Sequence, residues 1–140
     1  MEMNKTNNVA IADTSALISL LIENDANHEI ATQSLTDTLA AQVTMVTPSD
    51  VFTETVNTLG KKFGREVAIE AANYILSTPG FLVVEALETY PQALEKFRTG
   101  TGSPSFTDCV VMAIADKYQT KQVFGFDECF SKSNYQIPSL

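Results

Sequence analysis

The sequence predicts an α/β fold, a three-layer α/β/α sandwich with a central, mostly parallel sheet of four to five strands. Three observations favour this class. Short apolar or β-branched segments alternate with longer segments of helical periodicity along the chain. At least one helix separates each of the first four strands from the next, as the crossovers of a parallel sheet require. No repeat, linker or low-complexity tract interrupts the chain, so we expect one domain over 9–140 after a disordered lead-in over 1–8.

The first half of the chain shows this alternation clearly. The elements expected there, in order, are a strand at 9–12, helices at 14–22 and 27–42, a strand at 43–47, and helices at 48–62 and 65–77. Pro48 lies in the first turn of its helix, where its missing N–H costs little. Thr47 and Asp50 form a capping-box pattern around this start. Pro79 and Gly80 end the last of these helices.

The second half continues the pattern. The elements expected there are a strand at 81–86, a helix at 90–98, a loop rich in Gly, Ser and Thr at 99–105, a helix at 106–118, a strand at 122–127 and a short final strand that includes Ile137. Ser105 and Asp108 form a second capping-box pattern, at the start of helix 106–118. Strands that alternate with helices predict a parallel sheet with helices on both faces.

The composition is that of an ordinary globular protein. The 140 residues are 44% hydrophobic and 19% charged, and no apolar run approaches the roughly 20 residues that a membrane span needs. Segment 1–8 is polar and lacks the apolar core of a secretory signal. Cys109 and Cys129 are too few for a disulfide framework, so we expect both to be reduced in a cytoplasmic protein.

The charge balance restricts how this protein could bind a nucleic acid. Seventeen acidic and nine basic residues give a net charge of −8, which argues against a broad basic binding face. The balance does not exclude an enzyme whose clustered carboxylates are neutralised by bound cations. Lys61, Lys62 and Arg65 form the densest basic group. A solvated helix end is the simplest interpretation of this group, and a phosphate contact is the alternative.

Four acidic residues fall at strand ends or near helix starts. Asp13 and Asp127 end the first and fourth strands, whereas Glu54 and Asp108 lie near the starts of their helices. In a parallel sheet all these positions lie at one edge, so the four side chains could converge. Each also has a structural explanation, because the aspartates can cap helices or form Asx turns. Glu54 lies opposite the apolar stripe of its helix, where a solvated glutamate is the default.

Taken together, the four acids indicate a chemistry that none of them indicates alone. Two carboxylates ~4 Å apart repel by about 4 kcal/mol at an effective dielectric constant near 20, so a convergent group needs protons or cations. Mg²⁺ or Mn²⁺ suits a site of Asp and Glu without His or Cys ligands. Such ions bind phosphate oxygens and activate water. An acidic site can therefore act on a polyanionic substrate.

The sequence resembles the PIN domain family in a set of motifs whose order and spacing carry the resemblance. The set comprises Asp13 with Ser15, the separated Glu54, a helix with Asp108, Ala113 and Ala115, and the segment FDECF with Asp127 and Phe130. The resemblance extends from Val9 to the end of the chain. The size and layout are most like those of small VapC-type toxins of toxin–antitoxin pairs.

Membership of this family would imply a Mg²⁺- or Mn²⁺-dependent endoribonuclease, often homodimeric and encoded with an inhibitory antitoxin. By the resemblance, Asp13, Glu54, Asp108 and Asp127 would be the catalytic metal ligands, directly or through water. Ser15 would orient the first carboxylate by hydrogen bonding. Metal-activated water would hydrolyse an RNA phosphodiester to leave a 5′-phosphate and a 3′-hydroxyl. An antitoxin helix would bind apolar positions on the first three helices.

Gly125 departs from the family pattern. Many members carry Thr or Ser two residues before the last acid, and here that place is Gly125. The resemblance then implies that Asp127 is less firmly held or depends on Ser105 or Thr107.

Three other interpretations stay open at this level. The main alternative is a non-catalytic PIN-fold binding module whose acidic pocket holds a metal or only caps helices. A receiver domain would need paired acids after the first strand and a lysine after a late strand. A haloacid-dehalogenase-like phosphatase would need an acid where this chain has Ser15. The last two are therefore disfavoured.

Overall fold

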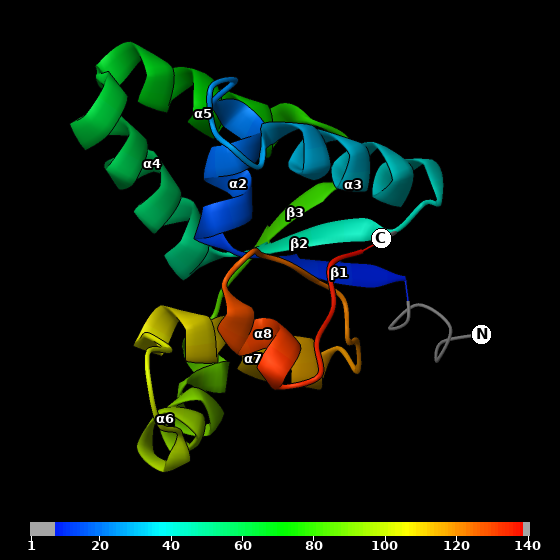
Figure 1. Ribbon diagram of the computed structural model, residues 1–140, viewed down its shortest axis with the longest axis vertical. Helices are drawn as coiled ribbons and strands as arrows, with labels where there is room; N and C mark the ends of the chain where they lie inside the picture. Colours follow the sequence, from blue (N-terminus) through cyan, green and yellow to red (C-terminus); the bar gives the residue numbers. More distant parts are fainter. Residues whose placement is uncertain (1–7, 139–140) are drawn as a thin grey trace.

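A sheet of four parallel strands, in the order β3-β2-β1-β4, forms the centre of the molecule (Figure 1). The computed structural model describes residues 8–138. The strands are β1 (Val9–Ala12), β2 (Thr44–Pro48), β3 (Phe81–Val84) and β4 (Val123–Phe124). β1 pairs with β2 on one side and β4 on the other, and all four of its residues are buried. The residue that follows β1 therefore emerges in the middle of the carboxyl edge of the sheet.

Helices cover both faces of this sheet. They are α2 (Thr14–Leu21), α3 (His28–Ala40), α4 (Ser49–Phe63), α5 (Arg65–Ser77), the short 3₁₀ helix η1 (Leu87–Thr89), α6 (Tyr90–Thr99), α7 (Phe106–Lys117) and α8 (Glu128–Lys132). Figure 1 shows α2 to α5 on one side of the sheet and α6 to α8 on the other. The predicted α/β/α class is confirmed. No helix within residues 8–138 is both long and apolar enough to cross a membrane.

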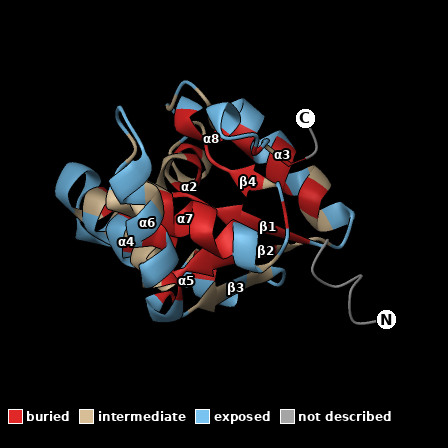
Figure 2. Cartoon of the chain, turned by 90° about the horizontal axis from the view of Figure 1, so that it is seen from below, coloured by how far each residue is buried: buried red, intermediate tan, exposed pale blue. Residues whose placement is uncertain are grey.

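The core lies where β1 packs against α7. All seven residues from Cys109 to Ala115 of α7 are buried, and the buried residues of β1, β4 and α7 lie together in Figure 2. A helix that is apolar on every side is typical of an element enclosed by neighbours. Because α7 is enclosed between the sheet and α6, its first turn is held firmly beside the end of β1.

The boundaries of most elements agree with the sequence patterns, but the last two strands differ and the helix α8 was not predicted. β3 ends at Val84 and β4 covers only two residues, so both are shorter than predicted. The predicted final strand is reduced to one parallel bridge between Gln122 and Gln136. Residues 1–7 of the predicted lead-in lie outside the described residues. Asn8 is described, and its carbonyl accepts a hydrogen bond from the backbone N–H of Thr44.

The capping box predicted for Thr47 and Asp50 is wrong. Pro48 occupies the N-cap position of α4, and no side chain caps this helix. The hydroxyl of Thr47 is buried without a hydrogen-bond partner, because β2 continues through this residue. The carboxylate of Asp50 instead accepts a hydrogen bond of 2.6 Å from the Tyr90 hydroxyl. Long-range contact with α6 has replaced the local cap.

Candidate active site

Asp13 lies at the carboxyl end of the central strand and is 4% exposed. Its backbone is extended, and its carboxylate caps α2 by accepting a hydrogen bond from the backbone N–H of Ser15 (3.3 Å). The Ser15 hydroxyl donates a second bond to the same oxygen, at 2.9 Å. The capping role foreseen from the sequence is present, and it fixes the direction of the carboxylate.

Ser15 also connects Asp13 to the loop that follows β4. Its hydroxyl accepts a hydrogen bond of 3.1 Å from the backbone N–H of Phe126. One hydroxyl therefore links two segments that are 111 residues apart. The orienting contact that the resemblance implied for Ser15 is observed.

Replacement of Ser15 by alanine is expected to lower the free energy of unfolding by about 1–3 kcal/mol, because the Phe126 N–H loses its partner and Asp13 loses one donor. Urea denaturation in the presence of EDTA measures the change. Ser77→Ala is the matched control, because within residues 8–138 its exposed hydroxyl bonds only to the carbonyl of Asn73. Equal stability of the two variants would contradict the proposed link.

Asp108 occupies the first turn of α7 and completes a capping box. Its N–H donates to the Ser105 hydroxyl (3.1 Å), and its carboxylate accepts from the Ser105 N–H (2.9 Å). One carboxylate oxygen makes this bond, and Asp108 remains part-exposed at the carboxyl edge of the sheet. The predicted capping box and a position in an acidic cluster are therefore compatible.

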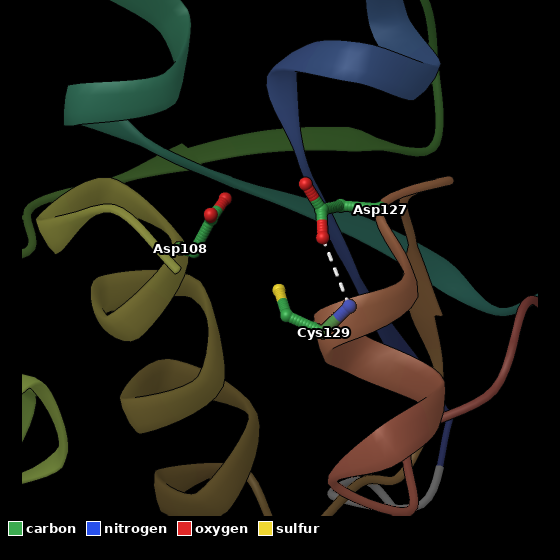
Figure 3. Close-up of side chains that lie close together, drawn as sticks. All are labelled: Asp108, Asp127 and Cys129. Carbon is green, nitrogen blue, oxygen red and sulfur yellow. Dashed lines mark hydrogen bonds between the residues drawn. The ribbon is translucent and has the colours of Figure 1, made fainter. Parts of the chain in front are cut away.

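Asp127 caps the last helix, α8, and faces Asp108. Its Oδ1 accepts a hydrogen bond of 2.9 Å from the backbone N–H of Cys129. Figure 3 shows the carboxylates of Asp108 and Asp127 on either side of a gap, with the Cys129 thiol beside it. Potential ligand atoms of these three residues lie within 4.8 Å of one another. In the stretch 8–138, this is the group that could hold a metal ion.

Glu54 reaches the site from α4. The Thr14 hydroxyl donates a hydrogen bond of 2.5 Å to Glu54 Oε1, which connects the start of α2 to the second turn of α4. Glu54 is exposed, on the polar side of its helix as the periodicity predicted. Burial is the main cause of the raised pKa of Asp108, and the charge of Glu54 makes the smallest contribution in the same direction.

The electrostatics show that these acids share one region. Burial, followed by the charge of Asp108, raises the pKa of Asp13 from 3.8 to about 6, against the lowering effect of the Ser15 hydrogen bonds. Burial also raises the pKa of Asp108, as do the charges of Asp127 and Glu54. None of the four ion pairs within the described residues involves these acids. The cluster has unfavourable negative charge without a basic partner.

A divalent cation fits this donor set. Carboxylate oxygens are the preferred ligands of Mg²⁺ and Mn²⁺, and positive charge would offset the repulsion among the acids. Cys129 was not among the predicted site residues. Burial, followed by the charge of Asp108, raises the pKa of its thiol, so it stays protonated and is a poor ligand for a hard ion. Asp108 and Asp127 are the better ligands of this group.

Gly125 is explained by close packing rather than by a missing hydroxyl. A Cβ at this position would lie 2.8 Å from Cε2 of Phe130 and 3.0 Å from Cβ of Asp13. Both neighbours are buried, and the Phe130 ring is only 2% exposed. The absence of a side chain at Gly125 lets the aromatic ring pack directly under the turn that presents Asp13.

The supporting residues are arranged differently from the expectation. Ser105 bonds to Asp108, whereas the described hydrogen bond to the Asp127 carboxylate comes from the Cys129 N–H. Thr107 and Glu54 both line an adjacent groove. Thr14 was missed by sequence reasoning, because a threonine in the first turn of a helix carries no signal of a partner 40 residues away.

The fold is that of a PIN domain. The family model of the PIN domain matches residues 10–133, and the chain belongs to this family. Among solved structures, the chain is similar to the Mycobacterium tuberculosis toxin VapC20, which is described as cleaving the sarcin-ricin loop. The sequences are 26% identical, the TM-score is 0.78, and the match covers 91% of this chain and 96% of that one. No curated protein matches the sequence. The resemblance to VapC-type PIN domains is confirmed.

Proposed function

We propose that this protein is a metal-dependent endoribonuclease that hydrolyses RNA phosphodiesters and acts as the toxin of a toxin–antitoxin pair. The main support is the position of Asp13 at the end of a central strand of a PIN domain. Its carboxylate is buried beside Asp108 and forms no ion pair with the basic residues that the structure describes. The similarity to a VapC toxin supports RNA as the substrate class.

The chain supplies two kinds of group for this reaction. Mg²⁺ or Mn²⁺ would be held by the predicted ligands, directly or through water: Asp13, Glu54, Asp108 and Asp127. When bound, the ion supplies charge neutralisation at the phosphate and activation of water. Ser15 holds the Asp13 carboxylate in one direction, and Thr14 does the same for Glu54. Such fixed ligands lower the reorganisation that the reaction requires.

Asp108→Asn is expected to reduce RNA cleavage at least tenfold, because the amide keeps the size of the side chain but removes a negative charge from the metal site. Cleavage of an unstructured RNA oligonucleotide is measured in Mg²⁺, in Mn²⁺ and in EDTA. The wild-type protein is expected to be inactive in EDTA.

Asp37→Asn is the matched control for Asp108→Asn, because Asp37 lies on α3 and its described side-chain partner is Gln33. The control is expected to keep wild-type activity. Undiminished cleavage by purified Asp108→Asn, or cleavage that persists in EDTA, would refute the proposal.

A non-catalytic binding module is the second candidate. The helix caps favour this candidate. The carboxylates of Asp13, Asp108 and Asp127 each accept a hydrogen bond from a backbone N–H at a helix N-terminus, a role that needs no metal. The two candidates differ in one measurement: a binding module would take up Mn²⁺ in calorimetry without cleaving RNA under the same conditions.

The proposed partner is an antitoxin that binds partly buried apolar side chains on α2, α4 and α5, so that α5 takes the place of α3 among the three helices expected from the sequence. A second apolar cluster lies there around Leu59, and partly buried side chains border it: Ile18, Leu21, Ile22, Val56 and Val67. Such a surface suits the apolar face of a partner helix. A homodimer and a cytoplasmic location are also proposed. Exposed apolar side chains on α5 and β3 support the homodimer: Ile69, Leu76 and Leu82.

A further inference from the structure

A groove of about 580 Å³ runs along the polar side of α4, away from the acidic cluster. Its lining from α4 includes Thr53, Glu54, Asn57, Thr58 and Lys61. These positions recur at intervals of three and four residues, so they share one face of the helix. Thr107, next to Asp108 in α7, completes the lining near the acids. The groove is therefore continuous with the candidate active site.

The side chains of this groove have a definite chemical character. Every lining residue within the described chain is polar: hydroxyls, an amide, two carboxylates and one ammonium. The carboxylates of Asp50 and Glu54 lie toward the start of α4, and Lys61 lies in its last turn. Hydroxyl, amide and ammonium groups are the usual partners of phosphate and sugar oxygens. An apolar peptide helix would find no complementary surface here.

We infer that this groove binds the RNA strand next to the cleaved bond, with Lys61 on a neighbouring phosphate. The inference rests on the proposed function, which places the scissile phosphate at the acids. Seven residues separate Glu54 from Lys61, or about 10 Å along the helix. Lys61 therefore contacts the strand beyond the scissile position, and Asn57 and Thr58 bind sugar or phosphate oxygens between them.

The inference also explains how so acidic a chain could hold RNA. With a net charge of −8, the chain has no excess of basic residues for a broad binding face. The Lys61 ammonium at the far end of the polar groove would attract the RNA backbone along the groove, away from the acidic cluster. Lys62 is also exposed in the same turn but is not among the residues that line the groove. The two lysines therefore provide a matched pair for a test.

The experiment compares Lys61→Ala with Lys62→Ala, using a short fluorescent single-stranded RNA of unstructured sequence. Binding is measured in EDTA over a series of salt concentrations, and cleavage is measured separately in Mg²⁺. Lys61→Ala is expected to weaken binding about two- to fivefold, as for loss of an exposed ion pair. It should also reduce the slope of log K against log salt by about 0.7, the value for one phosphate contact to a single strand. KM should rise by a similar factor with kcat nearly unchanged.

Lys62→Ala should match the wild type, and Lys61→Arg should restore binding. The inference is overturned if the two alanine variants bind with equal affinity and salt slope, or if the RNA does not bind at all. If the protein is not a nuclease, the result is different: the wild type would not cleave RNA, but RNA binding in EDTA would still depend on Lys61. If the Lys61→Ala and Lys62→Ala variants cleave RNA with the same KM and kcat, the nuclease function stands and the proposed role of the groove in RNA binding is rejected.

Discussion

Asp13→Asn is expected to reduce RNA cleavage roughly a thousandfold. The same substitution is expected to make the metal-free protein more stable at neutral pH. Activity is lost because the substitution removes a negative charge from the acidic cluster. Removal of a group that stabilises the transition state typically causes a loss of about this size. The gain in stability follows from burial, because Asp13 is 4% exposed and lies beside Asp108. Asparagine can keep the cap of α2 and the bond from Ser15.

The pH dependence gives this prediction a sign. The pKa of Asp13 is raised from 3.8 to about 6 in the folded protein, so the native state binds more protons than the unfolded state between these values. Stability from this group is complete below about pH 4 and falls as the pH rises toward 6. The accumulated loss is roughly 3 kcal/mol at pH 7. The asparagine variant, which does not titrate, avoids this loss.

Thermal unfolding in EDTA between pH 4 and pH 8 measures the effect. The melting temperatures of the two proteins should be similar near pH 4 and should diverge with rising pH, by roughly 5–10 °C at pH 7. Saturating Mn²⁺ should then raise the melting temperature of the wild type and leave that of Asp13→Asn nearly unchanged. A variant that is less stable than the wild type at pH 7 in EDTA would contradict the argument.

Gly125→Thr is expected to destabilise the protein by about 1–3 kcal/mol, although it restores the residue type that the family pattern favours. The new Cβ would lie within 3.0 Å of both Phe130 and Asp13, and neither can move into solvent. Displacement of the Asp13 turn should also reduce cleavage. Urea denaturation and the cleavage assay measure the two effects.

A double-mutant cycle tests whether Phe130 is the cause. Phe130→Leu alone should destabilise the protein, because a buried aromatic ring is lost. The double variant Gly125→Thr/Phe130→Leu should lose less free energy of unfolding than the two single variants together, with a coupling energy of about 0.5–3 kcal/mol. Additive effects would show that Phe130 does not restrict position 125. Gly60→Ala serves as the control for added volume, because its Cβ would meet Ala68 at an ordinary 3.6 Å.

The sequence predicted the caps of this site well wherever the cap is local. The Ser105–Asp108 box and the cap by Asp13 were predicted, and the Asx turn expected at Asp127 is present as the cap of α8, a helix that was not predicted. All three involve groups within three residues of one another. Such short-range hydrogen bonds depend on residue type and spacing, which a sequence displays directly. The box at Thr47 and Asp50 failed because Asp50 has a partner in α6, 40 residues away.

Burial was the least predictable property of the site residues. Asp13 and Asp127 have the same pattern in sequence, an acid after an apolar run and before a helix, but Asp13 is buried and Asp127 is exposed. The difference arises from strand order: β1 lies inside the sheet, whereas β4 lies at its edge. Strand order depends on long-range pairing, so the pattern at either residue could not reveal it.

The amino-acid sequence by itself determined the alternation of strands and helices, and with it the common edge at which four acids had to appear. Only the tertiary structure decided which acid is desolvated, which hydroxyls hold Asp13 and Glu54, and why position 125 carries no side chain. The physical reason is range. Periodicity and caps arise between near neighbours in the chain, whereas burial and repulsion between charges depend on segments that meet only after the chain has folded.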